Sequence, residues 1–222
     1  MRHQNLFAAS GLCAVAALAL PSALHAQTSA PAALVVAATA GGVEISGVRY
    51  APTAQVAGSK LQLNGAGTRF KFVVRVYTAG LYMGSMAGTP DEVYATPGPK
   101  RMHVVMLRDI DANELGKLFT RGMQDNTPRE AFSKYIAGTL RMADIFSARK
   151  KLVAGDNFSV DYVPGVGTTV LVNGKAQGEP VREVEFFNAL LSIWLGPNPA
   201  DDALKAALLG QEAPAPRGGR NR

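Results

Sequence analysis

The chain has 222 residues, of which 47% are hydrophobic and 18% charged, and a formal net charge of +6. This length and apolar content suit one globular domain with a sizeable core. The positive charge is scattered along the chain and not gathered into a patch, which argues against nucleic acid as a partner.

The N-terminus has the organisation of a secretory signal peptide. Arg2 precedes an apolar run from Leu6 to Leu20, and Ala23-Leu24-His25-Ala26 offers a small residue for cleavage before Gln27. The run is shorter than the roughly 20 apolar residues that a membrane-spanning helix needs. We therefore expect residues 1–26 to be a signal peptide, and the mature chain to be periplasmic or secreted and not to span a membrane.

The residue inventory of the mature chain excludes several kinds of chemistry. The single cysteine, Cys13, lies in the predicted signal peptide, so no disulfide, thiolate nucleophile or sulfur ligand is expected. His103 is the only histidine after residue 26, and its place in a predicted strand favours a structural role. The sequence contains no HExxH, CxxC, GxSxG or P-loop motif. We expect neither a metal nor a cofactor.

Composition also marks the limits of the domain. Residues 27–42 are rich in Ala, Thr and Gly, and residues 211–222 are rich in Pro, Gly and Arg. These compositions predict a flexible leader and a disordered basic tail, with the domain at 43–210 between them.

The first half of the domain predicts β-strands. Residues 43–46 and 60–63 alternate between apolar and polar, and 102–107 form an apolar run typical of a buried strand. The strongest signal is the run from Arg69 to Met83, which we expect to be one half-buried strand. One face of that strand would carry Phe70, Phe72, Val74 and Val76.

The second half of the domain alternates between helices and a hairpin. Asp111 can cap a helix that continues to about Gln124, and the series Thr127-Pro128-Arg129-Glu130 predicts a helix with Thr127 as its cap, ending near Lys150. This order indicates an α+β fold in which helices are layered on one face of an antiparallel sheet. The remaining predicted elements are strands at 157–163 and 168–172, a tight turn at 173–174, and helices over 186–194 and 201–210.

Arg69 is the strongest candidate for a binding residue. It follows the glycine-rich stretch 64–68, which allows close backbone approach, and it begins the strongest strand. A guanidinium group offers a planar fork of donors that suits a carboxylate or a developing oxyanion. Tyr77 has the same parity and could add a hydroxyl donor. Eight residues along a straight strand span roughly 26 Å, so the two can share one ligand only if the chain turns between them.

Four stretches resemble the chalcone isomerase-like family, and they span most of the domain. The similarity implies the open-faced β-sandwich of that family, in which a layer of helices covers a large antiparallel sheet. The stretches are Leu63–Arg69, Val76–Met83, Phe186–Leu195 and Asp202–Gly210.

The resemblance implies two activities. The family's enzymes cyclise chalcones to flavanones with an arginine that steadies the anion, whereas its non-catalytic members bind fatty acids through an arginine and a hydroxyl group. Arg69 matches the arginine, but the positions of the enzymes' other polar groups hold Tyr77, Leu115, Gly122 and Phe187. We therefore expect a non-catalytic binder of a fatty acid or similar apolar carboxylate, with Arg69 and Tyr77 as ligand-binding residues.

Two alternatives stay open. The first is an intramolecular lyase of the chalcone isomerase type acting on a phenolic ligand, with Arg69 as the catalytic residue; it requires a second proton-handling group near Arg69. The second is an envelope interaction protein with a vestigial cleft, which a closed and filled cleft would favour.

Overall fold

The computed structural model describes residues 42–211, all of which belong to one compact unit. The predicted signal peptide 1–26, leader 27–42 and tail 211–222 lie outside the described residues, apart from one residue at each border. Within 42–211, no helix is both long and apolar enough to cross a membrane.

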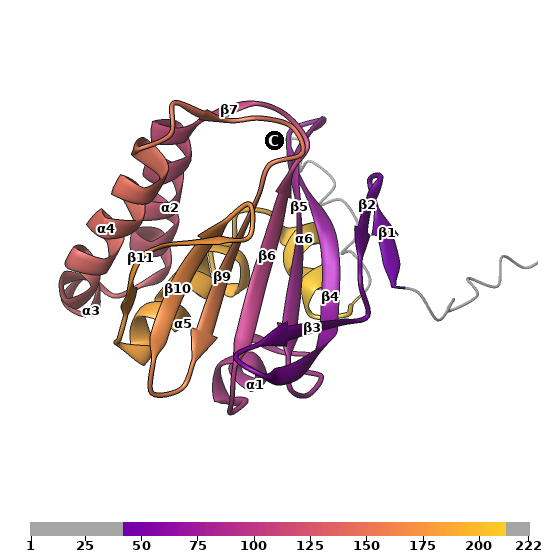
Figure 1. Ribbon diagram of the computed structural model, residues 1–222, viewed down its shortest axis with the longest axis horizontal. Coiled ribbons are helices and arrows are strands. Elements are labelled where there is room, and N and C mark those ends of the chain that lie inside the picture. The colour runs from indigo at the N-terminus through magenta and orange to yellow at the C-terminus, as the bar shows by residue number, and fades with distance from the viewer. Residues whose placement is uncertain (1–41, 212–222) are drawn as a thin grey trace, which may run out of the picture. The chain divides into compact units, whose positions relative to one another are not determined.

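A seven-stranded antiparallel sheet forms the frame of the domain (Figure 1), with the strand order β11-β10-β9-β6-β5-β4-β3. Consecutive strands mostly pair with one another, as short connections favour. Two small sheets, β1 with β2 and β7 with β8, flank it. The strands are β1 Val43–Ile45, β2 Val48–Tyr50, β3 Thr53–Val56, β4 Ser59–Lys71, β5 Val74–Met83, β6 Lys100–Met106, β7 Ile110–Asp111, β8 Lys151–Leu152, β9 Asn157–Val163, β10 Gly167–Val172 and β11 Lys175–Val181.

Helices cover one face of this sheet, so the predicted α+β class is confirmed. Figure 1 shows α5 and α6 behind the sheet and α2 with α4 beside them. Their apolar sides meet the inward residues of the strands in one large core. The helices are α1 Pro90–Ala95, α2 Ala112–Asn126, α3 Arg129–Phe132, the 3₁₀ turn Ser133–Tyr135, α4 Ile136–Ser147, α5 Val184–Leu195 and α6 Asp202–Leu208.

The other face of the sheet is only partly covered. The small β1–β2 sheet and β3 enclose a second apolar cluster there, built around Tyr50, Leu61 and Tyr82. Beyond that cluster, Arg101 and Asp161 form a two-pronged ion pair, with N–O distances of 2.6 and 2.5 Å. One helical layer and one open face agree with the open-faced sandwich that the family resemblance implies.

The predicted single strand from Arg69 to Met83 is wrong. β4 ends at Lys71, the chain turns at Phe72 and Val73, and β5 begins at Val74. Phe72 has a φ of +57°, a value more usual for Gly, Asn or Asp in a two-residue hairpin turn. The alternating apolar pattern runs through the turn without any of the residues that normally mark one, so periodicity alone predicted a continuous strand.

Capping signals predicted some helices correctly and others not. Asp111 caps α2 as expected, by accepting a hydrogen bond from the Glu114 amide at 3.0 Å. The single helix predicted for 127–150 is instead α3, a 3₁₀ turn and α4, and Pro128 takes the cap position expected for Thr127. Six elements were not predicted: the strands β2, β3, β7, β8 and β11, and the helix α1, although α1 begins with a capping box formed by Thr89 and Glu92.

Candidate functional site

The β4–β5 hairpin brings Arg69 and Tyr77 together. The two residues face each other across the antiparallel pair, because the chain turns at 72–73 and returns. The Arg69 guanidinium carbon lies 5.5 Å from the centroid of the Tyr77 ring, a cation–π contact. The condition for a shared site, a turn between the two residues, is therefore met.

Arg69 has unused hydrogen-bonding capacity. Its Nε atom is buried and has no hydrogen-bond partner among the described residues, and no carboxylate of residues 42–211 forms an ion pair with it. A buried donor without a partner is costly, so such groups usually mark a site that is completed by something else.

A cavity of about 190 Å³ lies beside Arg69, where the hairpin meets the chain between β6 and α2. Two of its acidic groups are engaged elsewhere, since Asp109 pairs with Lys151 at 3.0 Å and Asp111 caps α2. The lining thus combines cationic and apolar residues with three acidic ones, Asp109, Asp111 and Glu114. The cations are Arg69, Lys71 and Arg108, and the apolar residues are Val76, Ile110 and Leu118.

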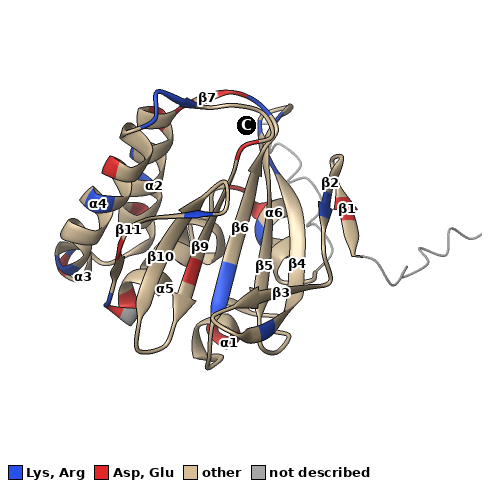
Figure 2. Cartoon of the chain, viewed as in Figure 1, with Lys and Arg blue, Asp and Glu red and all other residues tan. Residues whose placement is uncertain are grey.

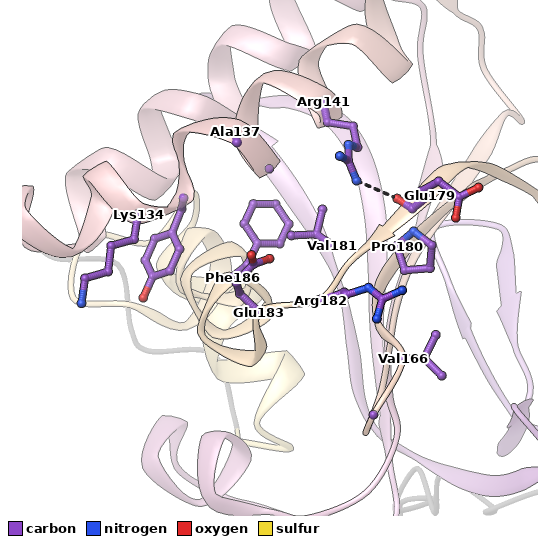
Figure 3. A pocket seen from close by; sticks show the side chains of 13 residues that line it. Lys134, Ala137, Arg141, Val166, Glu179, Pro180, Val181, Arg182, Glu183 and Phe186 are labelled. Atoms are coloured by element: carbon purple, nitrogen blue, oxygen red, sulfur yellow. Dashed lines mark hydrogen bonds between the residues drawn. The ribbon is translucent and has the colours of Figure 1, made fainter.

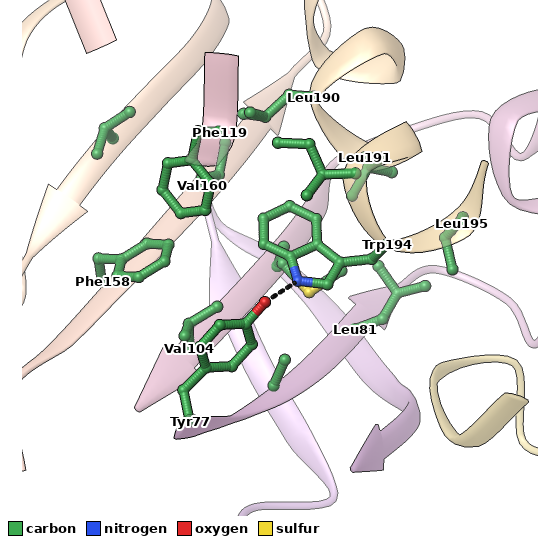
Figure 4. Close-up of a cluster of buried hydrophobic side chains, with 14 of the residues drawn as sticks. Tyr77, Leu81, Val104, Phe119, Phe158, Val160, Leu190, Leu191, Trp194 and Leu195 are labelled. Carbon is green, nitrogen blue, oxygen red and sulfur yellow. Dashed lines mark hydrogen bonds between the residues drawn. The ribbon is translucent and has the colours of Figure 1, made fainter. Parts of the chain in front are cut away.

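Tyr77 presents its ring to Arg69 and its hydroxyl to the core. The Tyr77 Oη accepts a hydrogen bond from Trp194 Nε1 at 2.9 Å (Figure 4). Burial raises the pKa of Tyr77 to about 12, although Arg69 and the Trp194 bond act in the opposite direction. Tyr77 is therefore a neutral phenol at physiological pH, and its hydroxyl is not among the groups that line the Arg69 cavity.

The space between the sheet and the helices is filled. Figure 4 shows Trp194 among Phe119, Leu81 and Leu191 beneath the sheet. The positions at which the chalcone-cyclising enzymes carry polar groups are packing positions here. Leu115 and Phe187 are fully buried, Phe187 stacks on Tyr162 at 5.2 Å, and Gly122 lies against Ile193.

The glycines before Arg69 serve a packing purpose. A Cβ atom on Gly65 would lie 2.1 Å from the Ala207 carbonyl oxygen, and one on Gly67 would lie 2.7 Å from the Ala207 Cβ. Asn64 stabilises this contact between β4 and α6 by donating a hydrogen bond to the Leu208 carbonyl at 2.8 Å. The close backbone approach expected of this stretch therefore brings α6 onto β4.

A larger groove of about 620 Å³ lies between α4, the start of α5, the end of β11 and the β9–β10 turn (Figure 3). Phe186 and Val181 form its apolar floor, and Arg141 reaches over it to the Glu179 carbonyl at 3.3 Å. Its volume falls in the range of small-molecule sites. Sequence reasoning did not find it, because its walls come from three separate segments, 134–141, 165–166 and 179–186.

His103 lies on the open face, where its Nδ1 is 2.8 Å from the Ser159 hydroxyl. Burial and the neighbouring Arg101 lower the pKa of His103, against the opposing influence of Asp161. In the unfolded chain the imidazole therefore takes up a proton at a higher pH than in the folded protein. Stability should fall as pH drops below about 6.5, the ordinary pKa, until the folded-state pKa is passed.

The variant His103→Gln tests this predicted pH dependence of stability. We expect the free energy of unfolding of the native protein, relative to that of the variant, to decrease between pH 7.5 and pH 5. Urea unfolding followed by circular dichroism at both pH values measures it. A difference between the two proteins that does not change with pH would contradict the assignment to His103.

The fold and the arginine site define an open-faced sandwich with a small cavity beside Arg69 at one end of its sheet. The sequence profile of the chalcone isomerase-like family matches residues 42–210. The chain therefore belongs to the chalcone isomerase-like family.

One solved structure with this fold is that of a fatty-acid binding protein from Arabidopsis thaliana. The two chains are 14% identical and superpose with a TM-score of 0.59, over 73% of this chain and 92% of the plant protein. At this identity the likeness establishes the fold. No curated protein sequence gives a match.

The described residues offer no metal site, since no group of three or more His, Cys, Asp or Glu side chains within 42–211 could hold an ion. The buried Nε of Arg69 makes the cavity beside it the candidate functional site, with the groove beside Arg141 as its rival.

Proposed function

We propose that the protein is a non-catalytic binder of an apolar carboxylate such as a fatty acid, and that Arg69 holds the carboxylate. The observation that carries the proposal is the buried Nε of Arg69, which has no partner among the described residues and lies beside a cavity lined by charged and apolar residues. Family membership and the shared fold with a plant fatty-acid binding protein support the ligand class.

The geometry assigns separate tasks to the two predicted ligand-binding residues. Arg69 would donate two hydrogen bonds to the carboxylate, the arrangement that its planar fork favours. Tyr77 would contribute through its ring, which lies under the guanidinium and limits its freedom to move. The cavity is smaller than the roughly 300 Å³ of ordinary ligand sites, so the acyl chain would extend past Ile110 and Leu118 at its edge.

Arg69→Gln provides the test, with dodecanoic acid as the probe and isothermal titration calorimetry as the measurement. We expect affinity to fall tenfold or more, because a charge-assisted hydrogen bond contributes about 1.5–3 kcal/mol. The melting temperature should change little. Arg141→Gln, in the larger groove, is the matched control and should bind as the native protein does. Loss of binding in Arg141→Gln alone would move the site to that groove.

A second function is favoured by the filled interior. If the space between sheet and helices never opens, the protein is an interaction protein whose ligand cleft is vestigial. Failure of the native protein to take up any fatty acid of 8 to 18 carbons would support this function over the first.

We also place the mature protein in the periplasm, on the basis of residues 1–26. Fusion of this segment to a reporter enzyme that is active only after export tests the placement, and an inactive fusion would contradict it.

A further inference from the structure

The tip of the β4–β5 hairpin is the most exposed apolar feature of residues 42–211. Phe72 is 93% exposed and Val73 is 91% exposed, and each is flanked by a half-exposed neighbour, Phe70 at 43% and Val74 at 41%. Four large apolar side chains that follow one another closely in the sequence thus project from one end of the sheet. Isolated exposed apolar residues are common, but a contiguous group marks an interaction surface.

The turn at the tip has a backbone conformation that an aromatic residue disfavours. Phe72 adopts a φ of +57°, which glycine accepts readily and an aromatic residue does not. A glycine or asparagine would form the same turn with less strain and less exposed apolar area. The turn therefore exposes an aromatic side chain at a position where local backbone preference does not favour one.

Basic residues surround the tip. Lys71 and Arg75 are its immediate neighbours in the hairpin, and Arg108 lies across the Arg69 cavity from Lys71; all three are exposed. In Figure 2, ribbon segments coloured as basic residues lie at this end of the sheet near β7, with segments coloured as acidic residues between them. Several acidic groups near the tip are engaged: Asp109 pairs with Lys151, Asp201 accepts from the Phe70 and Leu204 amides, and Asp111 caps α2. Glu114 also lines the Arg69 cavity with Lys71 and Arg108.

We propose that this tip docks the protein onto an anionic phospholipid bilayer. Phe70, Phe72, Val73 and Val74 would enter the boundary between headgroups and acyl chains, while Lys71, Arg75 and Arg108 contact lipid phosphates. A small apolar projection ringed by long basic side chains matches the two components of peripheral membrane binding, apolar insertion and attraction to anionic lipid. The proposal uses no contact with a bound ligand, so it stands apart from the function proposed for Arg69.

Co-sedimentation with vesicles tests the proposal. The protein as purified from cells is mixed with vesicles of phosphatidylcholine alone or with one third phosphatidylglycerol. We expect binding to the anionic vesicles that weakens as salt is raised. The double variant Phe72→Ser/Val73→Ser should lower the partition coefficient at least about tenfold, and Lys71→Gln/Arg75→Gln about 30-fold.

Leu140→Ser is the matched control, because Leu140 is also exposed, at 61%, but lies on α4. It should bind as the native protein does. All substituted side chains are exposed, so melting temperatures should agree within a few degrees.

Several outcomes would overturn the proposal. They are equal binding to neutral vesicles, unchanged binding by Phe72→Ser/Val73→Ser, or no binding at low salt. A dimer that the same double variant abolishes, without vesicle binding, would show that the tip instead contacts a second copy of the chain.

Discussion

Replacing Trp194 with alanine is expected to lower the free energy of unfolding by about 3–5 kcal/mol, the usual cost of deleting a large buried aromatic side chain. Trp194 is 1% exposed and packs edge-on against Phe119, with ring centroids 5.9 Å apart. Phe119 in turn contacts Phe146 and Phe158. Because small domains are stable by only about 5–15 kcal/mol, this loss is large. Urea unfolding followed by circular dichroism measures it.

Two milder changes separate packing from the hydrogen bond to Tyr77. Trp194→Phe keeps an aromatic ring but removes the donor, and Tyr77→Phe removes the acceptor. A double-mutant cycle of these two variants should give a coupling energy of about 1 kcal/mol. Trp194 is the only tryptophan of the chain, so protein fluorescence should also change when Tyr77 is replaced by Phe. If Trp194→Ala lowers the free energy of unfolding by less than about 1.5 kcal/mol, this core is not close-packed.

Substituting Gly65 with alanine is expected to destabilise the protein by about 3 kcal/mol or more, the upper part of the range for overpacking. The added methyl group would lie 2.1 Å from the Ala207 carbonyl oxygen and 2.8 Å from that of Leu208. Both obstacles are backbone, which cannot rotate away as a side chain can. The C-terminal part of α6 would have to move off β4, and the Asn64 bond to Leu208 would lengthen or break.

Gly84→Ala is the matched control for Gly65→Ala. No atom lies within 4 Å of the Cβ position at Gly84, so stability should change by less than about 0.5 kcal/mol. Thermal unfolding of the two variants side by side makes the comparison. Equal stability of the Gly65 and Gly84 variants would mean that the contact between β4 and α6 is looser than described.

The Arg69 cavity and the proposed membrane-docking tip share one end of the sheet. Lys71 and Arg108 line the cavity and also belong to the basic ring around the tip. If both proposals hold, an apolar carboxylate would reach Arg69 directly from the bilayer. The double variant at Phe72 and Val73 would then slow the uptake of dodecanoic acid from vesicles while leaving its affinity in solution unchanged.

Elements with strong local signals could be predicted from the sequence alone. The strand Asn157–Val163 was predicted with its observed bounds, and Asp111 was identified as the cap of α2. The antiparallel sheet with a helical layer followed from the order of such elements. Arg69 was predicted as a candidate because a glycine-rich stretch before a strand is also a local feature.

The errors arose where the local signal was weak or belonged to two structures at once. The run through Phe72 has the period of a strand on both sides of a turn, so periodicity could not place the turn. The glycines at 65 and 67 were expected to favour close approach, but the sequence did not say that α6, about 140 residues later, is the segment that approaches.

The sequence by itself determined the fold class, the order of most elements, and Arg69 as the candidate binding residue. Only the tertiary structure decided what surrounds that arginine: Tyr77 beneath it, the Tyr77 hydroxyl directed to Trp194, and a small cavity in place of an open cleft. It also decided that Phe72 and Val73 project outward. The reason is physical, since local patterns set which face of an element is apolar, whereas strand register and the packing of distant segments set which side chains meet.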